Sequence, residues 1–260
     1  MTGSGKSNMG IYEKFAYIYA NGVYADFSGQ MAELLPSVLT RLEARPRMIL
    51  DLACGEGTFA VAMAKRGFRV AGLDLSSRML KFARDRAEEA KVGLDLVRGD
   101  MRCLPFADKF DLVTCWFDSL NYLVEPEDLR AAFIGVSHAL RPGGLFIFDM
   151  NTVYGLAVNW REYPCYVQKD SPHIFEIHRQ EYDFETNVAT MKITGFIKKG
   201  NAWARIDEEH TERGYSQEEI RTHLTDLGFQ AVACWHSFRD MSEAKHDSGR
   251  VWYIAKRRPA

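Results

Sequence analysis

The sequence predicts an α/β fold with a parallel sheet and an inserted antiparallel sheet. An apolar run from Met48 to Leu52 is followed by two glycines and then by a helical pattern that starts at Thr58. Apolar runs and helical patterns alternate as far as Asp149, which is typical of an α/β domain. From residue 173 to residue 213 the hydrophobic period changes to the strict alternation of β-strands.

The turn after the first strand has the glycine spacing of a ligand-binding loop. Gly55 and Gly57 allow a sharp turn and let a ligand lie against bare backbone. The helix that begins at Thr58 offers free N–H groups to an electron-rich ligand atom. The pattern Gly55-x-Gly57-x-x-Ala60 also fits the dinucleotide fingerprint. This turn alone therefore leaves open a nicotinamide-dependent oxidoreductase and a turn that binds nothing.

Two acidic residues favour a bound ligand. Asp51 lies inside the first apolar run, near the carboxyl end of the strand, where a buried carboxylate needs a partner. The ammonium group of an amino acid would supply that partner. Asp74 closes the second apolar run, nineteen residues after Gly55. An acid at this position accepts hydrogen bonds from ribose hydroxyls.

Four stretches, in order along the chain, resemble the motifs of the class I S-adenosylmethionine-dependent methyltransferases. Asp51 to Thr58 resembles their first motif, and Gly72 to Ser76 their ribose-binding motif. Gly99 to Met101 resembles their adenine-binding turn, and Leu140 to Gly144 the turn before their fifth strand. The resemblance implies a seven-stranded Rossmann-like sheet with strand order 3-2-1-4-5-7-6 and an antiparallel last strand. It implies S-adenosylmethionine as the cofactor and S-adenosylhomocysteine as the product.

The resemblance also assigns residues to parts of the cofactor. We expect Asp100 to accept from the adenine amino group, the N–H of Met101 to donate to a ring nitrogen, and Met79 to lie under the adenine. Tyr19 or Tyr24 is expected to hydrogen-bond the methionine carboxylate from an N-terminal lid. The predicted cofactor-binding residues are Tyr19, Tyr24, Asp51, Ala53, Cys54, Gly55, Gly57, Thr58, Asp74, Leu75, Met79, Asp100, Met101, Phe117 and Asn121.

The loop after the fourth predicted strand, residues 117–123, is expected to face the methyl acceptor. Ligands of open α/β sheets bind beyond the carboxyl ends of the strands. The polar residues Asp118, Ser119, Asn121 and Tyr122 are therefore candidates for an acceptor-side wall, and an Asx turn that caps the next helix is the alternative. The loop lacks the Asn/Asp-Pro-Pro-aromatic motif of enzymes that methylate adenine or glutamine amides.

The remaining elements follow from local patterns. Amphipathic spacing predicts a helix from Glu125 to Leu140, and the capping box Ser216-x-x-Glu219 starts another. The predicted strands after the first are Phe68–Leu75, Leu94–Arg98, Phe110–Trp116, Leu145–Asp149, His173–Phe184, Val188–Lys198, Ala202–Arg213, Phe229–Phe238 and Arg250–Lys256.

The chain is expected to divide into three parts. Residues 1–44 form a helical lid, residues 45–152 and 214–260 the cofactor-binding core, and residues 153–213 an antiparallel β insertion that covers the substrate site. This layout resembles that of aminosugar N,N-dimethyltransferases. The run Gly3 to Ser7 ends like a phosphate-binding loop, but it lacks the preceding strand and the earlier glycine that this motif needs.

Composition excludes several classes of partner. A formal net charge of −2 over 260 residues gives no basic field for nucleic acid. No apolar run is long enough to span a membrane and no signal peptide opens the chain. The five scattered cysteines argue against a zinc site or a disulfide framework and indicate a cytoplasmic protein. We expect a monomer or homodimer that acts on a small molecule.

The predicted reaction is methyl transfer to nitrogen or oxygen of a small-molecule acceptor. An amine acceptor must react in its neutral form, and Asp118, Asp149, His178 and His210 are candidates to take its proton. None of them is singled out as a catalytic residue. Three alternatives remain: methylation of protein or RNA, a nucleotide-binding oxidoreductase, and a cofactor-binding module without catalysis.

Overall fold

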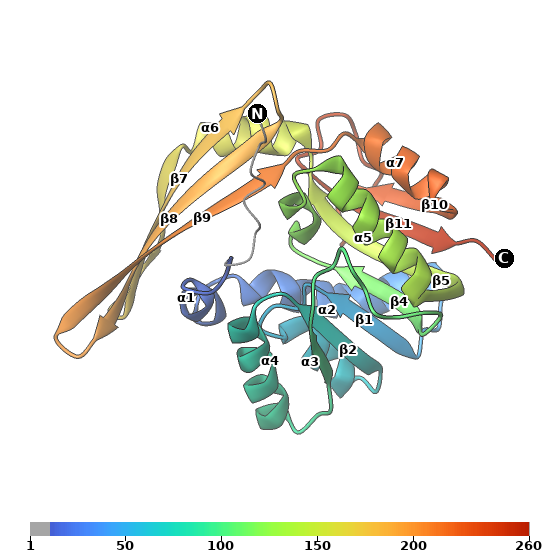
Figure 1. The fold of residues 1–260 in the computed structure, drawn as a ribbon, viewed down its shortest axis with the longest axis horizontal. Helices are drawn as coiled ribbons and strands as arrows, with labels where there is room; N and C mark the ends of the chain where they lie inside the picture. The colour runs from blue at the N-terminus through green and yellow to red at the C-terminus, as the bar shows by residue number, and fades with distance from the viewer. Residues whose placement is uncertain (1–10, 260) are drawn as a thin grey trace.

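The core of the molecule is a seven-stranded sheet, seen in a computed structural model that describes residues 11–259. Its strand order is β10-β11-β5-β4-β1-β2-β3 (Figure 1). The strands are β1 (Met48–Leu52), β2 (Arg69–Asp74), β3 (Asp95–Arg98), β4 (Phe110–Cys115), β5 (Leu140–Asn151), β10 (Phe229–Trp235) and β11 (Arg250–Arg257). Strands β1 to β5 pair in parallel, and β11 runs antiparallel to both β5 and β10. Counted within this sheet alone, the order is the predicted 3-2-1-4-5-7-6 with an antiparallel last strand.

Helices cover both faces of this sheet. On one face, α5 (Pro126–Ala139) and α7 (Gln217–Asp226) pack on the strands through buried side chains such as Phe133 and Leu224. On the other face, α2 (Ala25–Arg41) and α3 (Thr58–Lys65) pack through side chains such as Leu35 and Phe59. The α4 helix (Ser77–Ala90) lies beside α3, against β2 and β3. The central parallel strands β1, β2 and β4 are thus buried on both sides, as their continuous apolar runs require, while the edge strand β3 is only partly buried.

Local signals set the ends of several helices. The Ser76 side chain accepts a hydrogen bond from the Met79 N–H and so caps α4. Ser216 and Glu219 form both bonds of the predicted capping box at α7. Gly67 and Gly228 have positive φ just past the ends of α3 and α7, a conformation in which glycine carries no Cβ penalty.

The start of β5 differs from the prediction. The stretch Arg141 to Gly144 was expected as a turn before the strand, but β5 already begins at Leu140. The pairing with β4 shifts between Phe110, opposite Leu140, and Leu112, opposite Leu145. Residues 141–144 have no partner in β4 and form a bulge within the strand, where the sequence predicts a turn.

The inserted segment is a second, four-stranded antiparallel sheet in the order β6-β7-β8-β9. Its strands are β6 (Cys165–Asp170), β7 (Ile174–Asp183), β8 (Val188–Lys199) and β9 (Ala202–Arg213), and a π-helical turn (Gly155–Asn159) and α6 (Trp160–Glu162) lead into it. The sequence predicted three of these strands and missed β6. The hairpin of β8 and β9 extends away from the core, and the N-terminal helix α1 (Ala16–Asn21) lies close to this sheet (Figure 1).

The inner face of the insertion sheet meets the N-terminal segment. Phe15, Ile18 and Tyr24 share a buried cluster with Ile174 and Ile193 of the sheet. The first ten residues of the predicted lid, including the run Gly3 to Ser7, lie outside the described part of the chain. Among residues 11–259, no helix combines the length and the apolar character that crossing a membrane requires.

Candidate functional site

A cavity of about 580 Å³ lies at the carboxyl ends of β1, β2 and β3. The sheet side is formed by Ala53, Asp74, Leu75, Asp100 and Met101. The opposite side is formed by the start of α5 and the segment before it, including Tyr122 and Asp128. The N-terminal residues Ile11 and Tyr12, with Thr211 of the insertion, also line it. The cavity therefore has walls from all three predicted parts of the chain.

The glycine turn is shaped by three residues with positive φ, Ala53, Gly55 and Gly57. A Cβ atom on Gly57 would lie 2.8 Å from the Cβ of Ala83 in α4, so a side chain has no room there. Close contact between the turn and α4 therefore requires glycine at this position.

Asp74 connects the turn to the end of β2. Its carboxylate accepts hydrogen bonds of 2.8 Å from the backbone N–H of Gly55 and of 2.8 Å from that of Ser76. Burial raises the pKa of Asp74 to about 6, although the hydrogen bonds from Ser76 and Gly55 oppose the shift. Asp74 also lines the cavity, so it can accept hydrogen bonds from a ligand.

Two further carboxylates lie inside the turn. Asp51 is buried, and its Oδ1 accepts a bond of 3.2 Å from the Thr114 hydroxyl, while its Oδ2 accepts none from residues 11–259. Glu56 is also buried; it accepts from the N–H and hydroxyl of Thr58 and lies 3.3 Å from the Arg86 guanidinium. Burial raises the pKa of both acids. The interior of the turn is therefore acidic.

Asp100 lies at the end of β3 in a fixed ion pair. Arg102 reaches its carboxylate at 2.6 Å through one terminal nitrogen and reaches Asp128 at 2.8 Å through the other. The hydrogen bonds from Arg102 lower the pKa of Asp100, which keeps it ionised. Arg102 thus holds an acceptor in place at the wall of the cavity.

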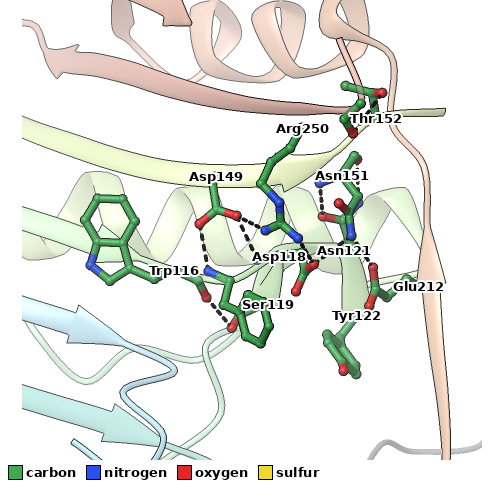
Figure 2. Close-up of polar contacts among 12 residues, drawn as sticks. Trp116, Asp118, Ser119, Asn121, Tyr122, Asp149, Asn151, Thr152, Glu212 and Arg250 are labelled. Atoms are coloured by element: carbon green, nitrogen blue, oxygen red, sulfur yellow. Dashed lines mark hydrogen bonds and ion pairs between the residues drawn. The ribbon is translucent and has the colours of Figure 1, made fainter. Parts of the chain in front are cut away.

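A second polar cluster lies under the loop that follows β4 (Figure 2). Phe117 and Asp118 are consecutive non-glycine residues with φ of 58° and 51°. The buried carboxylate of Asp149 accepts from the N–H of Phe117 at 2.7 Å and from that of Asp118 at 3.0 Å. Arg250 donates to both Asp149 and Asp118. The cluster holds this strained loop in one conformation.

The N-terminal segment is attached to the insertion sheet by polar contacts. The carboxylate of Glu208 accepts from the backbone N–H groups of Tyr12, Lys14 and Phe15. The Tyr24 hydroxyl donates to Glu176 and lies 3.3 Å from a ring nitrogen of His178. These bonds join two parts of the chain that both border the site.

Comparison with known proteins identifies the family. Residues 49–144 match the methyltransferase domain family. A solved S-adenosylmethionine-dependent methyltransferase from Clostridium acetobutylicum shares 28% identity with a TM-score of 0.82, over 95% of this chain and 99% of that chain. The chain is a class I S-adenosylmethionine-dependent methyltransferase.

Two further relatives agree with this assignment. YqeM of Bacillus subtilis is 29% identical over 252 residues, which cover 95% of this methyltransferase and 97% of YqeM. The dTDP-3-amino-3,4,6-trideoxy-alpha-D-glucopyranose N,N-dimethyltransferase of Streptomyces venezuelae is 34% identical over 139 residues, which cover 54% of this chain and 55% of that protein.

The acidic turn fits the cofactor of this methyltransferase family. S-adenosylmethionine carries positive charge on its ammonium and sulfonium groups. Asp51 is a buried residue, and its Oδ2 receives no hydrogen bond from the described residues; Asp74 lines the cavity. Among the described residues that line the cavity, Arg102 is the one with a basic side chain. Its charge is neutralised by ion pairs with Asp100 and Asp128.

The structure places the predicted cofactor residues in three groups. Ala53, Asp74, Leu75, Asp100 and Met101 line the cavity. Asp51, Cys54, Gly55, Gly57 and Thr58 form the turn behind it, where the Sγ of Cys54 lies against Gly72. The remaining five, Tyr19, Tyr24, Met79, Phe117 and Asn121, are not among the cavity-lining residues.

These five have other neighbours. Tyr19 and Tyr24 stack with ring centroids 4.8 Å apart, and Met79 lies behind Gly55. Phe117 packs against Phe27. The Asn121 side chain donates to backbone carbonyls of β5 and β9 at 2.8 and 2.7 Å. Their roles toward the cofactor stay predictions.

The sequence missed several residues of the site. Tyr12, Arg102 and Asp128 line the cavity, and Arg250 and Glu212 belong to the polar cluster. The only signal for Arg102 is its position just after Asp100. Arg250 contacts Asp149 across 101 residues, and no local pattern marks that pairing.

Proposed function

We propose that this methyltransferase transfers a methyl group from S-adenosylmethionine to a nitrogen or oxygen atom of a small molecule. The observation that carries the proposal is the composition of the cavity. Tyr12 from the N-terminal segment and Thr211 from the insertion border the same space as Asp74 and Asp100. A site with walls on several sides suits an acceptor that can be enclosed, and it suits a folded protein or an RNA helix less well.

Each carboxylate at the strand ends has a proposed ligand group. Asp51 pairs with the ammonium of the methionine part, Asp74 accepts from the ribose hydroxyls, and Asp100 accepts from the adenine amino group while the N–H of Met101 donates to the ring. The order of these residues from β1 to β3 matches the order of the groups along the cofactor.

The chemistry requires little from the protein beyond positioning. When bound, the cofactor supplies a methyl group that its sulfonium already activates. The chain's own residues would hold the acceptor in line and exclude water, and orientation of this kind contributes up to roughly 7–11 kcal/mol in intramolecular models. The N-terminal segment and the insertion are the parts placed to exclude water.

We infer that the protein works in a reducing cytoplasm as a monomer or homodimer, without nucleic acid. All five cysteines are unpaired, which supports a reducing compartment. The net charge of −2 supports a partner other than nucleic acid.

Titration calorimetry with S-adenosylhomocysteine tests the cofactor assignment. The wild-type protein should bind, and Asp74→Ala should weaken binding at least about tenfold, because a buried acceptor for two ribose hydroxyls is lost. Asp85→Ala is the control: Asp85 is an exposed acid on α4 that pairs with Lys81. Equal binding by Asp74→Ala and Asp85→Ala would contradict the placement. Mass spectrometry of a mixture of small molecules incubated with a deuterated methyl donor then identifies acceptors.

A further inference from the structure

Beside its apolar cluster with the N-terminal segment, the inner face of the insertion sheet carries a group of buried polar side chains. Glu176, His178 and Gln180 of β7 alternate with exposed or half-buried residues, and all three are at most 9% exposed. His210 and Glu212 of β9 are 2% and 4% exposed. A sheet that served only to pack on the core would bury apolar side chains, because burying polar groups costs free energy unless they find partners.

Carboxylates outnumber cations where this face meets the polar cluster. Three carboxylates are buried here, those of Asp118, Asp149 and Glu212, and the guanidinium of Arg250 is the cation in contact with this group. Arg250 donates to Asp149 and Asp118. Glu212 receives only the Asn151 side-chain amide, at 2.9 Å, and the same amide donates to Asp118 at 2.7 Å. Burial, and then the charge of Asp118, raise the pKa of Glu212 well above its ordinary value.

Several open hydrogen-bonding positions here are carboxylate or amide oxygens, and Nε2 of His210, 3.1 Å from Glu208, is a buried ring nitrogen on the same face. Oδ1 of Asp118 and Oε1 of Glu212 accept no hydrogen bond from residues 11–259, and their partnered oxygens both face Asn151 (Figure 2). On the same face of the sheet, Oε2 of Glu176 and Oε1 of Gln180 are buried without any described partner. Buried acceptors without donors call for a ligand that donates several hydrogen bonds and carries positive charge.

Asp118 and Glu212 do not themselves line the cofactor cavity, but their chain neighbours Ser119 and Thr211 do. The Tyr12 and Tyr122 side chains line that cavity with hydroxyls 3.0 Å apart, and Tyr122 also lies 2.8 Å from Nδ1 of His210. Burial raises the pKa of both tyrosines, and the nearby charges of Asp118 and Glu212 raise it further. The acidic pair is thus close to the two hydroxyls at the cavity wall.

The backbone places Asp118 in a conformation that costs free energy. Non-glycine residues with positive φ cost about 1 kcal/mol or more each, and two occur in succession at Phe117 and Asp118. The hydrogen bonds from both N–H groups to Asp149 hold them there. Such strain, fixed by a buried network, is typical of residues positioned for a ligand.

We propose that Asp118 and Glu212 form the acceptor subsite of this enzyme, that the acceptor is a primary or secondary amine bound as its ammonium ion, and that Glu212 takes the ammonium proton. This inference rests on the proposed function and narrows the acceptor to an amine. The bare oxygens of the two acids receive the ammonium N–H groups, and the positive charge of the ligand balances the excess of carboxylates.

The step balances in atoms and charge. One N–H bond of the ammonium breaks, and its proton moves to the Glu212 carboxylate, leaving a neutral amine. The nitrogen lone pair then attacks the methyl carbon as the sulfur–carbon bond breaks. S-adenosylhomocysteine leaves as a neutral thioether, the product is an N-methylammonium ion, and Glu212 returns its proton to water when the product leaves.

The test compares Glu212→Gln with Glu209→Gln. Glu209 is exposed on the same strand, so its substitution controls for the change in β9. Each protein is loaded with S-adenosylhomocysteine, and its melting temperature is measured with pairs of probes. The two members of a pair differ only in carrying an ammonium or a hydroxyl group. Examples are 3-amino-3-deoxy-D-glucose with D-glucose, and primary amines with the corresponding alcohols. Methyl transfer to the same probes is measured with S-adenosylmethionine.

The expected result has three parts. Amines, and not alcohols, raise the melting temperature of wild type and of Glu209→Gln. The same two proteins methylate the amines and leave the alcohols unmethylated. Glu212→Gln keeps cofactor binding but loses the amine effect, with kcat/KM reduced about 10²-fold or more. Its remaining activity should rise with pH up to the pKa of the amine itself, because only amine that arrives neutral can react, whereas wild type should decline only as Glu212 becomes protonated. Asp118→Asn, judged by the same melting screen, should lose the amine effect too.

Two results would overturn the proposal. One is methylation of alcohols in preference to amines. The other is that both variants bind S-adenosylhomocysteine and respond equally to every amine tested, in melting temperature and in methyl transfer. Failure of wild type to bind S-adenosylhomocysteine would instead contradict the proposed cofactor site, so the two failures are distinguishable.

Discussion

The backbone N–H of Gly55 donates a hydrogen bond of 2.8 Å to the carboxylate of Asp74. This bond joins the turn after β1 to the end of β2. The same carboxylate lines the cavity, and burial raises its pKa to about 6. One side chain therefore holds the glycine turn in shape and presents an acceptor to the ligand.

We expect the affinity for S-adenosylhomocysteine to rise with pH from about 5 to about 7. Ribose hydroxyls donate hydrogen bonds and so favour the ionised carboxylate of Asp74, which prevails above its pKa of about 6. Below that pKa the dissociation constant should change up to about tenfold per pH unit. Titration calorimetry across this range measures the change, and Asp74→Asn should show a flatter profile. The same pH profile in both proteins would contradict the role of Asp74.

Gly57→Ala should destabilise the protein through a clash as well as backbone strain. A Cβ there would lie 2.8 Å from the Cβ of Ala83, and φ is +84°. Gly67→Ala is a matched control, because Gly67 has φ of +90° but nothing within 4 Å of an added Cβ. Strain should cost both variants about 1 kcal/mol, and overpacking should cost Gly57→Ala about 1–3 kcal/mol more. Urea denaturation measures the difference; equal losses would mean that α4 moves aside freely.

Most of the core fold could be predicted because its signals are local. The connections β1–α3–β2, β2–α4–β3 and β4–α5–β5 each combine an apolar run, a turn and a helix that are close together in the sequence. The missed strand, Cys165–Asp170, is short and has exposed or half-buried side chains, so it lacks a clear alternation. The bulge at the start of β5 was read as a turn because Pro142, Gly143 and Gly144 are turn-forming residues.

The site residues that could be predicted from the sequence are those at or just after the end of a single strand. Asp74, Asp100 and Met101 follow strand ends that the sequence marks clearly, and all three line the cavity. Glu212 lies on an alternating strand, where its spacing says only which face it shares. Its approach to Asn151 and Asp118 depends on how the insertion sheet docks on the core, which no pattern within β9 encodes.

Arg250→Gln should be among the most destabilising substitutions in the polar cluster. Arg250 is the guanidinium that pairs with the buried carboxylates of Asp118 and Asp149. Removing one partner of a buried ion pair costs about 3–5 kcal/mol, because the remaining charge is left without compensation. Arg205→Gln is the control: Arg205 pairs with Asp207 on the surface, where such pairs contribute at most about 1 kcal/mol.

The loss in Arg250→Gln should also depend on pH. Without the guanidinium, the pKa of Asp149, already about 6 through burial, rises further. The folded state then binds more protons than the unfolded state above the ordinary carboxyl pKa, so stability falls as pH rises. The gap between the variant and wild type in the free energy of unfolding should therefore be larger near pH 8 than near pH 5. A gap that narrows toward high pH would contradict the assignment of Arg250 as the neutralising cation.

Tyr24→Phe should loosen the contact between the N-terminal segment and the insertion sheet. The Tyr24 hydroxyl donates to Glu176, which has a second oxygen buried without a described partner. The variant keeps the ring that stacks on Tyr19 but removes this donor, so we expect a loss of about 1–3 kcal/mol. Hydrogen exchange should accelerate in residues 16–24 and 174–178 and stay unchanged in α5, since local opening needs only the contact to break. Tyr17→Phe is the control, because Tyr17 is 47% exposed on α1, in the same N-terminal segment. If both variants lose equal stability and leave exchange unchanged in these segments, the Tyr24 hydroxyl does not hold the two parts together.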